Sequence, residues 1–494
     1  MNSSPVTSKT PKTLKLTARL LLPCLVAVIS STPVYAQTSP TSQFKKIARN
    51  YGISAGSVSV YLKKIGDQQP FLAWNADAPR NPASTIKILT TFVALTELGP
   101  NYRWKTESYS RVLPVKGAVD GLYLKGYGDP YLITESFWRF IRGIKNRGLR
   151  HIKGDLILDK SFFQRIKNNP ADFDGRPARS YNVNPTALLL NFQSINYKFR
   201  PDALNQRIKI IPDPDAGTKV VNKVKLSGGR CGAWKRKIKL NTYPDKTEFK
   251  GRFASSCGER GYYRVATNGS QFIYGVFKKL WQEQGGTLAG QWQEAVVPDD
   301  AKLLHTHYSP PMSNVIRAIN KYSNNVMTRQ LLLTLGAEKI GLPGTVDKGR
   351  TVINDWLEEN GFNFPELVID NGAGLSRDTR ISARHMGELL TFAYGDPRMP
   401  EFMSSLPIAS YDGTLQKRFA GTALEGRLHL KTGLLDDVRA SAGYMLDNNG
   451  QRWVVVIQHN DRNAPQRAGQ RFQDAILRWV YLQTLPGNGE ELIY

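Results

Sequence analysis

The sequence predicts an α/β fold: an antiparallel sheet with helices on both sides, interrupted by a large β-rich insertion. Strand-like segments lie near both ends of the chain, at 57–64 and 71–75 and again at 427–433 and 441–460. Helix-like segments lie between the two groups. From about 99 to 298 the pattern changes to short alternating stretches with frequent turns. Strands from both chain ends therefore meet in one sheet, around a buried helical cluster.

The predicted helices follow from apolar periodicity and flanking turn residues. The first begins near Ser84 and continues through ILTTFVALTEL, whose apolar residues cover most faces and so predict a buried helix. DNNG at 447–450 predicts a hairpin turn, whereas the Ser/Thr/Pro-rich residues 37–45 are expected to form a tether. Further helices are expected at 271–285, 313–335, 347–360, 382–394 and 470–483.

The first 36 residues have the pattern of a secretory signal. Four basic residues precede the apolar stretch LLLPCLVAVIS, and small residues end at Val-Tyr-Ala, so we expect cleavage after Ala36. The apolar stretch is short for a membrane span, and no other long apolar run exists, so no transmembrane segment is expected after cleavage. The expected segments are a signal at 1–36, the first part of the main domain at 37–98, the insertion at 99–298 and the second part at 299–494.

Removal of Cys24 with the signal leaves two cysteines, Cys231 and Cys257. An even pair in an oxidising compartment predicts a disulfide, worth roughly 3 kcal/mol in the chain-entropy model. Two cysteines without a companion histidine cluster predict no zinc site. His305 and His307 could share one strand face, but no third ligand matches them, so we expect no metal. No cofactor is expected either.

The positive charge is regional. Residues 99–298 hold 35 Lys and Arg against 16 Asp and Glu, or +19 of the total +26. Export argues against a nucleic-acid partner, despite the tract WKRKIK at 234–239. The remaining interpretations are attraction to an anionic cell-wall polymer, attraction to a membrane surface, and a basic face that is merely solvated.

Three short motifs carry the candidate chemistry. Ser84 and Lys87 form S-x-x-K at a predicted helix start, Ser323 and Asn325 form S-x-N in a helical connection, and Lys431 begins K-T-G on a predicted strand. Each motif alone is weak, and Ser84 by itself is more typical of a helix cap than of a nucleophile. Their order and structural context together favour nucleophilic catalysis.

With these motifs the sequence resembles the class C, type-4 penicillin-binding proteins, which are D-alanyl-D-alanine carboxypeptidases/endopeptidases. NPASTIKILTT, GDPYL, GDLILDKSFF, DNGAGLSR, SLPIASYDGTLQKRF and LKTGLLDDVRASAGY are similar to stretches of that family, as is the run around S-x-N. The resemblance covers most of residues 50–480. It implies a penicillin-binding/β-lactamase-like transpeptidase fold with an insertion of two subdomains, and a periplasmic enzyme that cleaves peptidoglycan stem peptides and is inhibited by β-lactams.

The resemblance and the residue chemistry together assign roles. Ser84 is the expected nucleophile and Lys87 its base, with a pKa lowered by burial and by Lys431. Asn325 is expected to hold the substrate amide, and Ser323 to bridge the two lysines and relay a proton to the departing D-alanine. The expected contacts to the rest of the substrate are made by Lys431, Thr432, Gly433, the backbone N–H of Leu434, Asp159 and Arg377.

Leu434 departs from the small hydroxyl residue that this family often has after K-T-G. Because the expected oxyanion contact is made by the backbone N–H of this residue and that of Ser84, catalysis should survive the change. Asp159 and Arg377 match family positions that reach the diaminopimelate side chain of the peptide, although surface salt bridging is an equally good interpretation of both. Two other functions stay open: a β-lactamase, and a catalytically silent module that binds the cell wall or senses β-lactams.

Overall fold

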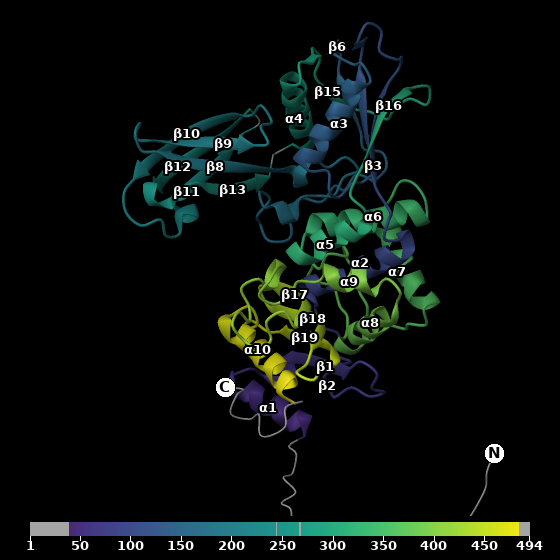
Figure 1. Ribbon diagram of the computed structural model, residues 1–494, viewed down its shortest axis with the longest axis vertical. Coiled ribbons are helices and arrows are strands. Elements are labelled where there is room, and N and C mark those ends of the chain that lie inside the picture. The colour runs from purple at the N-terminus through teal and green to yellow at the C-terminus, as the bar shows by residue number, and fades with distance from the viewer. Residues whose placement is uncertain (1–38, 244, 266–267, 484–494) are drawn as a thin grey trace, which may run out of the picture. The chain divides into compact units, whose positions relative to one another are not determined.

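The first and last strands of the chain pair in one five-stranded antiparallel sheet, as predicted (Figure 1). Its order is β17-β18-β19-β1-β2. The predicted hairpin turn at 447–450 joins β18 to β19, and the register of β1 and β19 pairs Leu62 with Val455. The strands are β1 (Val58–Lys64), β2 (Leu72–Trp74), β17 (Leu428–Leu435), β18 (Val438–Leu446) and β19 (Arg452–Asn460).

The computed structural model describes residues 39–243, 245–265 and 268–483. The predicted signal peptide and its cleavage after Ala36 lie outside the described residues. Within the described ranges, no helix is both long and apolar enough to cross a membrane.

Helices cover both faces of the sheet, because its central strand β19 is apolar on both sides. Val454 and Val456 pack with the helices of one face, whereas Val455 and Ile457 pack with those of the other. The first face carries α2 (Lys87–Leu98), α5 (Met312–Tyr322), α6 (Asn325–Lys339), α7 (Val346–Glu359), α8 (Ala383–Gly395) and α9 (Met399–Ser405); the second carries α1 (Pro40–Asn50) and α10 (Arg467–Leu482).

Two predictions about the helices were wrong. The expected tether at 37–45 contains the start of α1, whose Phe44 is fully buried and packs on Phe472 of α10. Pro40 opens this helix, a position where the missing N–H has no intrahelical partner to lose. The expected single helical segment at 313–335 is divided between α5 and α6, because Ser323 has a left-handed backbone with φ 55°.

The predicted β-rich insertion is built around two groups of strands. The first is a five-stranded sheet of order β15-β7-β5-β3-β16, accompanied by α3 (Thr134–Asn146), which the sequence pattern did not reveal, and α4 (Gly269–Glu283). The boundaries of the insertion at 99 and 298 remain a prediction. The last strand of this sheet, β16, lies beyond residue 298 and ends at Tyr308. Its strands are β3 (Lys105–Ser110), β5 (Leu122–Gly126), β7 (Leu156–Asp159), β15 (Trp292–Glu294) and β16 (Lys302–Tyr308), beside a small sheet of β4 (Ala118–Val119), β6 (His151–Ile152) and β14 (Thr287–Leu288).

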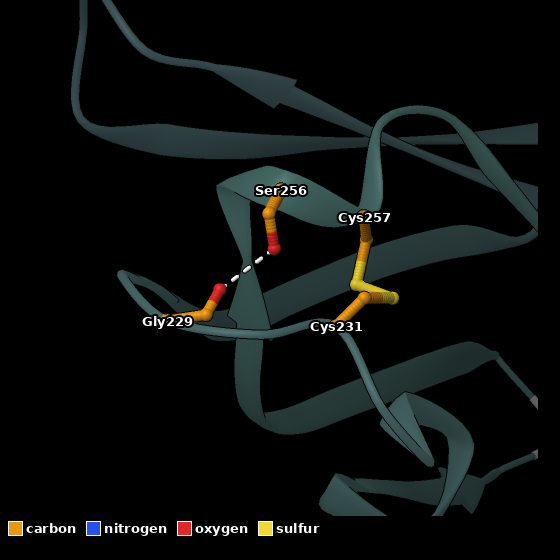
Figure 2. The surroundings of a disulfide bond; sticks show 4 residues. All are labelled: Gly229, Cys231, Ser256 and Cys257. Carbon is orange, nitrogen blue, oxygen red and sulfur yellow. Dashed lines mark hydrogen bonds between the residues drawn. A yellow bond between two sulfur atoms is a disulfide. The ribbon is translucent and has the colours of Figure 1, made fainter.

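The second group is a sandwich of two three-stranded sheets, packed through aromatic side chains such as Phe199, Phe249 and Phe253. The predicted disulfide between Cys231 and Cys257 lies here, with its Cα atoms 4.7 Å apart, and the Ser256 hydroxyl donates to the carbonyl oxygen of Gly229 beside it (Figure 2). One sheet consists of β8 (Ser194–Asp202), β9 (Arg207–Asp213) and β13 (Arg260–Val265), and the other of β10 (Lys219–Ser227), β11 (Ile238–Thr242) and β12 (Lys246–Ala254).

Candidate active site

Ser84 lies in a short 3₁₀ turn, Ala83–Ile86, that leads directly into α2 at Lys87. Its hydroxyl makes no capping hydrogen bond, so the interpretation of Ser84 as a helix cap is wrong. The turn is held from outside, since the Asn81 side-chain oxygen accepts the Ala83 N–H at 2.8 Å. Ala83 has a left-handed φ of 45°, a strained conformation for a non-glycine residue beside the proposed nucleophile.

Lys87 is fully buried beneath Ser84. Its Nζ lies 2.9 Å from the Ser84 Oγ and 2.6 Å from the Asn325 Oδ1, and it also donates to the carbonyl oxygen of Ala373. Burial, followed by the charges of Lys431 and Arg329, lowers the pKa of Lys87 well below its usual range. No carboxylate forms an ion pair with this amine among the described residues, so the site favours a neutral lysine.

The second lysine stands on β17, where Lys431 is also fully buried. Its Nζ donates to the Ser323 Oγ and to the carbonyl oxygen of Thr432, both at 2.8 Å. Burial lowers the pKa of Lys431 to about 7. Ser323 is thus bound to Lys431, whereas Asn325 is the S-x-N residue bound to Lys87; the predicted bridge from Ser323 to both lysines is not formed by hydrogen bonds in this structure.

Two glycines let the strand and a loop approach the nucleophile. A Cβ at Gly433 would lie 2.7 Å from the carbonyl oxygen of Pro82 and 3.0 Å from the backbone nitrogen of Ser84. A Cβ at Gly374, whose φ is +72°, would lie 1.9 Å from the carbonyl oxygen of Ala83. Only glycine permits these approaches without displacing the backbone. The K-T-G glycine therefore places the edge strand β17 directly beside Ser84.

The site opens into a cleft of about 850 Å³. Leu434 lines it with an exposed side chain, while the Thr432 hydroxyl is hydrogen-bonded to that of Thr414 at 2.8 Å. The main domain contributes Ser84, Tyr322 to Val326, Gly374, Leu375, Arg377 and Leu434 to Asp436; the insertion contributes Phe173, Asp174, Arg176, Ser180, Tyr181, Asn191, Phe192, Ser194 and Tyr263.

Asp159 does not line this cleft, so the structure contradicts its predicted contact with substrate. It ends β7 with no exposed surface, and its carboxylate accepts the N–H groups of Ser161 and Val297 at 2.9 and 2.8 Å. Lys125, its neighbour on β5, lies 3.6 Å away. These partners occupy the carboxylate, which makes Asp159 a structural residue.

The acid of the insertion that does line the cleft is Asp174. Burial acts to raise its pKa, but hydrogen bonds from Tyr181 and Asn182 hold the pKa of this carboxyl below its usual value. Arg377 lines the cleft, and its predicted contact with substrate stays a prediction; it lies over the ring of Phe173 and is paired with Asp436 and Asp437.

The insertion is joined to α6 by two side chains that motif analysis missed. Arg329, one turn after Asn325, donates to the carbonyl oxygens of Tyr181 and Val183. Gln330 accepts the Thr186 N–H at 2.9 Å. The spacing of Asn325 and Arg329 could have indicated the first of them, because residues at i and i+4 lie on adjacent turns of one helix face. The cleft wall is therefore anchored to the helix that carries the S-x-N asparagine.

Comparison with known protein families and solved structures identifies relatives of this chain. A family model described as D-Ala-D-Ala carboxypeptidase 3 (S13) matches residues 41–481. The chain belongs to this family. It is a serine-type D-Ala-D-Ala carboxypeptidase by class, and the resemblance found in the sequence is confirmed.

Relatives and solved structures cover most of the chain. A D-alanyl-D-alanine carboxypeptidase of Actinomadura sp. (strain R39) is 27% identical over 416 residues, covering 80% of this chain and 76% of the relative. Penicillin-binding protein 4 from Haemophilus influenzae has the same fold, with a TM-score of 0.73 at 21% identity, covering 89% of this chain and 99% of that one. A structure of that protein complexed with a novel β-lactam gives a TM-score of 0.70 at 20% identity, with the same coverage.

Proposed function

We propose that this enzyme cleaves peptides ending in D-Ala-D-Ala through an ester formed on Ser84. The observation that carries the proposal is the set of contacts around the buried Lys87 Nζ. A neutral amine has two hydrogens and one lone pair, and the Asn325 amide oxygen and the Ala373 carbonyl oxygen can only accept. Both hydrogens are therefore used, and the lone pair faces the third neighbour, the Ser84 hydroxyl at 2.9 Å.

In the proposed acylation step the Ser84 oxygen attacks the carbonyl carbon of the penultimate D-alanine. Its proton passes to the Lys87 lone pair, and the C–N bond to the terminal D-alanine breaks. Backbone N–H groups of Ser84 and Leu434 are the proposed oxyanion donors. Lys431, whose pKa burial lowers to about 7, supplies a proton through Ser323 to the departing amine. Water then hydrolyses the ester: its hydroxide takes the acyl group, its proton returns through Ser323 to Lys431, and the proton held by Lys87 restores the Ser84 hydroxyl.

We propose peptidoglycan stem peptides as the substrate and the periplasm as the site of action. A cleft of about 850 Å³ leaves room for a branched peptide beyond the scissile bond. Arg377 of the main domain and Asp174 of the insertion offer charges of both signs to a diaminopimelate side chain, which carries an amine and a carboxylate. The same cleft would admit a cross-linked peptide, so cleavage of D,D cross-links belongs to this proposal. β-Lactams would acylate Ser84 in the same way.

The test is incubation of the mature protein and its Ser84→Ala variant with purified muropeptides, followed by mass analysis of the products. We expect the parent to release D-alanine and the variant to release none. Arg377→Gln should raise KM for diaminopimelate peptides but not for a short D-Ala-D-Ala peptide without that side chain. A parent that neither releases D-alanine nor splits cross-linked dimers would contradict the proposal.

The two other functions are separated by labelled penicillin. A long-lived adduct on Ser84 supports the peptidase, because a β-lactamase must hydrolyse the adduct quickly. An adduct with no D-alanine release from any muropeptide would favour the sensing module.

A further inference from the structure

The sandwich within the insertion concentrates positive charge on one face of one sheet. Residues 194–265 hold 17 Lys and Arg against 6 Asp and Glu, or +11 of the +19 in the insertion. On β10, β12 and β11 the apolar residues that alternate with the charged ones, such as Val224, Phe249 and Ile238, pack into the core. The opposite face, called the basic face below, carries Lys219, Lys223, Lys225, Lys239, Lys246, Lys250 and Arg252, with Glu248 as its one acid in the described strands.

The register places these cations in rows across the three strands. Lys250 on the central strand pairs with Lys223 on one side and Lys239 on the other. Lys225 pairs with Arg252 in the next row. Neighbouring strands are about 4.8 Å apart and alternate residues along a strand about 7 Å apart, so the face is a grid of positive charges.

Folding requirements do not account for this arrangement. Like charges directly opposite on adjacent strands destabilise a sheet. Lysines commonly protect exposed sheet edges, yet Lys250 and Arg252 stand on the central strand β12. Glu248 forms ion pairs with Lys223 and Lys250, at 2.6 and 2.8 Å. Lys225 and Arg252 form no ion pair with any described residue.

On the other sheet of the same sandwich, four of the six cations have acidic partners. Lys198 pairs with Asp213 at 2.7 Å, and Arg200 pairs with Glu259 at the same distance. Asp202 lies 3.1 Å from Arg207. Among the described residues, the basic face therefore has five cations without an acidic partner, whereas the whole of the other sheet has two.

We propose that the basic face binds a polyanionic cell-wall polymer, the carboxylate-bearing sacculus, and holds the enzyme on its substrate. Six of the seven cations are lysines, mobile point charges that suit a repeating polyanion better than a single bidentate ligand. The outward positions of the three strands carry only one apolar residue, Val221, for entering lipid. The neighbouring aromatic side chain, Tyr243 just after β11, has the Lys246 Nζ over its ring at 5.2 Å, which leaves that ring face covered for stacking on bases. The choice of sacculus rests on the proposed function.

The disulfide ties down a second basic segment next to the strands of the basic face. It links Cys231, just before the 3₁₀ turn Trp234–Lys237, to Cys257 in the turn that follows β12 (Figure 2). The turn Trp234–Lys237 packs against β12 and β11. Lys235, Arg236 and Lys237 on this turn are all exposed. The turn therefore adds three exposed cations beside β11 and β12.

The test is co-sedimentation of the mature protein with purified sacculi. The face variant combines Lys219→Glu, Lys225→Glu, Lys239→Glu and Arg252→Glu, four exposed residues without ion pairs in the described chain. A control variant makes the same change in net charge on the main domain, also at exposed residues without described ion pairs: Arg49→Glu, Arg462→Glu, Arg467→Glu and Arg471→Glu. Melting curves and penicillin acylation establish that each variant is folded.

We expect the affinity of the parent for sacculi to fall at least about ten-fold between low and high salt, because exposed charges are screened. The face variant should bind at least about ten-fold more weakly than the parent at low salt, since each cation contributes near a charged surface. The control should stay within about two-fold of the parent, because its sites lie outside the face and the effect decays within a Debye length.

Three results would overturn the proposal: salt-independent binding, equal losses in the face and control variants, or tighter binding of the parent to anionic phospholipid vesicles than to sacculi. If the face variant proves unfolded, the glutamine version of the same four changes replaces it. Penicillin acylation separates this proposal from the proposed function. An acylated protein that fails to bind sacculi contradicts the basic face alone, whereas a protein that is neither acylated nor able to release D-alanine contradicts the catalytic proposal.

Discussion

Replacement of Gly433 by alanine tests the close approach of β17 to the nucleophile. The added Cβ would lie 2.7 Å from the carbonyl oxygen of Pro82, against about 3.4 Å for ordinary contact, so strand and turn must separate by about 0.7 Å. It would also lie 3.0 Å from the nitrogen of Ser84, the proposed oxyanion donor. Because a misplacement of about 1 Å can reduce a rate 100-fold, we expect acylation to slow by roughly 10- to 100-fold.

The assay is the second-order rate of acylation by labelled penicillin, measured beside the melting temperature. Gly395→Ala is the matched control, because a Cβ at the end of α8 meets nothing within 4 Å. The control should acylate at the parent rate. If Gly433→Ala acylated within about three-fold of the parent while remaining folded, the close contact would not be what positions the site.

Three further predictions concern stability and pH. Burial raises the pKa of Asp129 to about 7, so the folded state loses stability as the pH rises above the unfolded pKa of 3.8. The loss reaches about 4 kcal/mol by pH 8, and Asp129→Asn should remove it. Urea unfolding of both proteins at several pH values measures the difference. Arg329→Met removes a charge that lowers the pKa of Lys87 and should move the acid limb of the acylation profile to higher pH, whereas a purely structural effect would lower the rate at every pH. Replacing Cys231 and Cys257 by serine should lower the unfolding free energy of the sandwich by about 3 kcal/mol and leave penicillin acylation intact. An unchanged unfolding transition would contradict a stabilising role of the disulfide.

Local patterns were sufficient for the elements of the main sheet. The apolar run in β19 and the DNNG turn predicted a strand and a hairpin because short-range periodicity determines both. The tether at 37–45 was mispredicted because its Ser/Thr/Pro composition hides Phe44, whose helix is stabilised only when α10 and the sheet bury this side chain.

That Ser84, Lys87, Ser323, Asn325 and Lys431 lie together could be predicted because their three motifs are unusual in combination, but the hydrogen-bond partners of each atom could not. That Asn325, rather than Ser323, contacts Lys87 depends on the break between α5 and α6, a tertiary detail. Asp159 was assigned by position in a motif, yet the parallel neighbour strand places Lys125 against it. Asp174 lies in a loop whose path no sequence period specifies.

The central claim is that Lys87 is neutral and receives the Ser84 proton. Its most direct test is the rate of Ser84 acylation by labelled penicillin as a function of pH. Burial and neighbouring cations lower the pKa of Lys87 well below 10.5, so the rate should rise with pH and level off well before that value. A rate that continues to rise ten-fold per pH unit up to about pH 10.5 would identify an ordinary lysine and contradict the account.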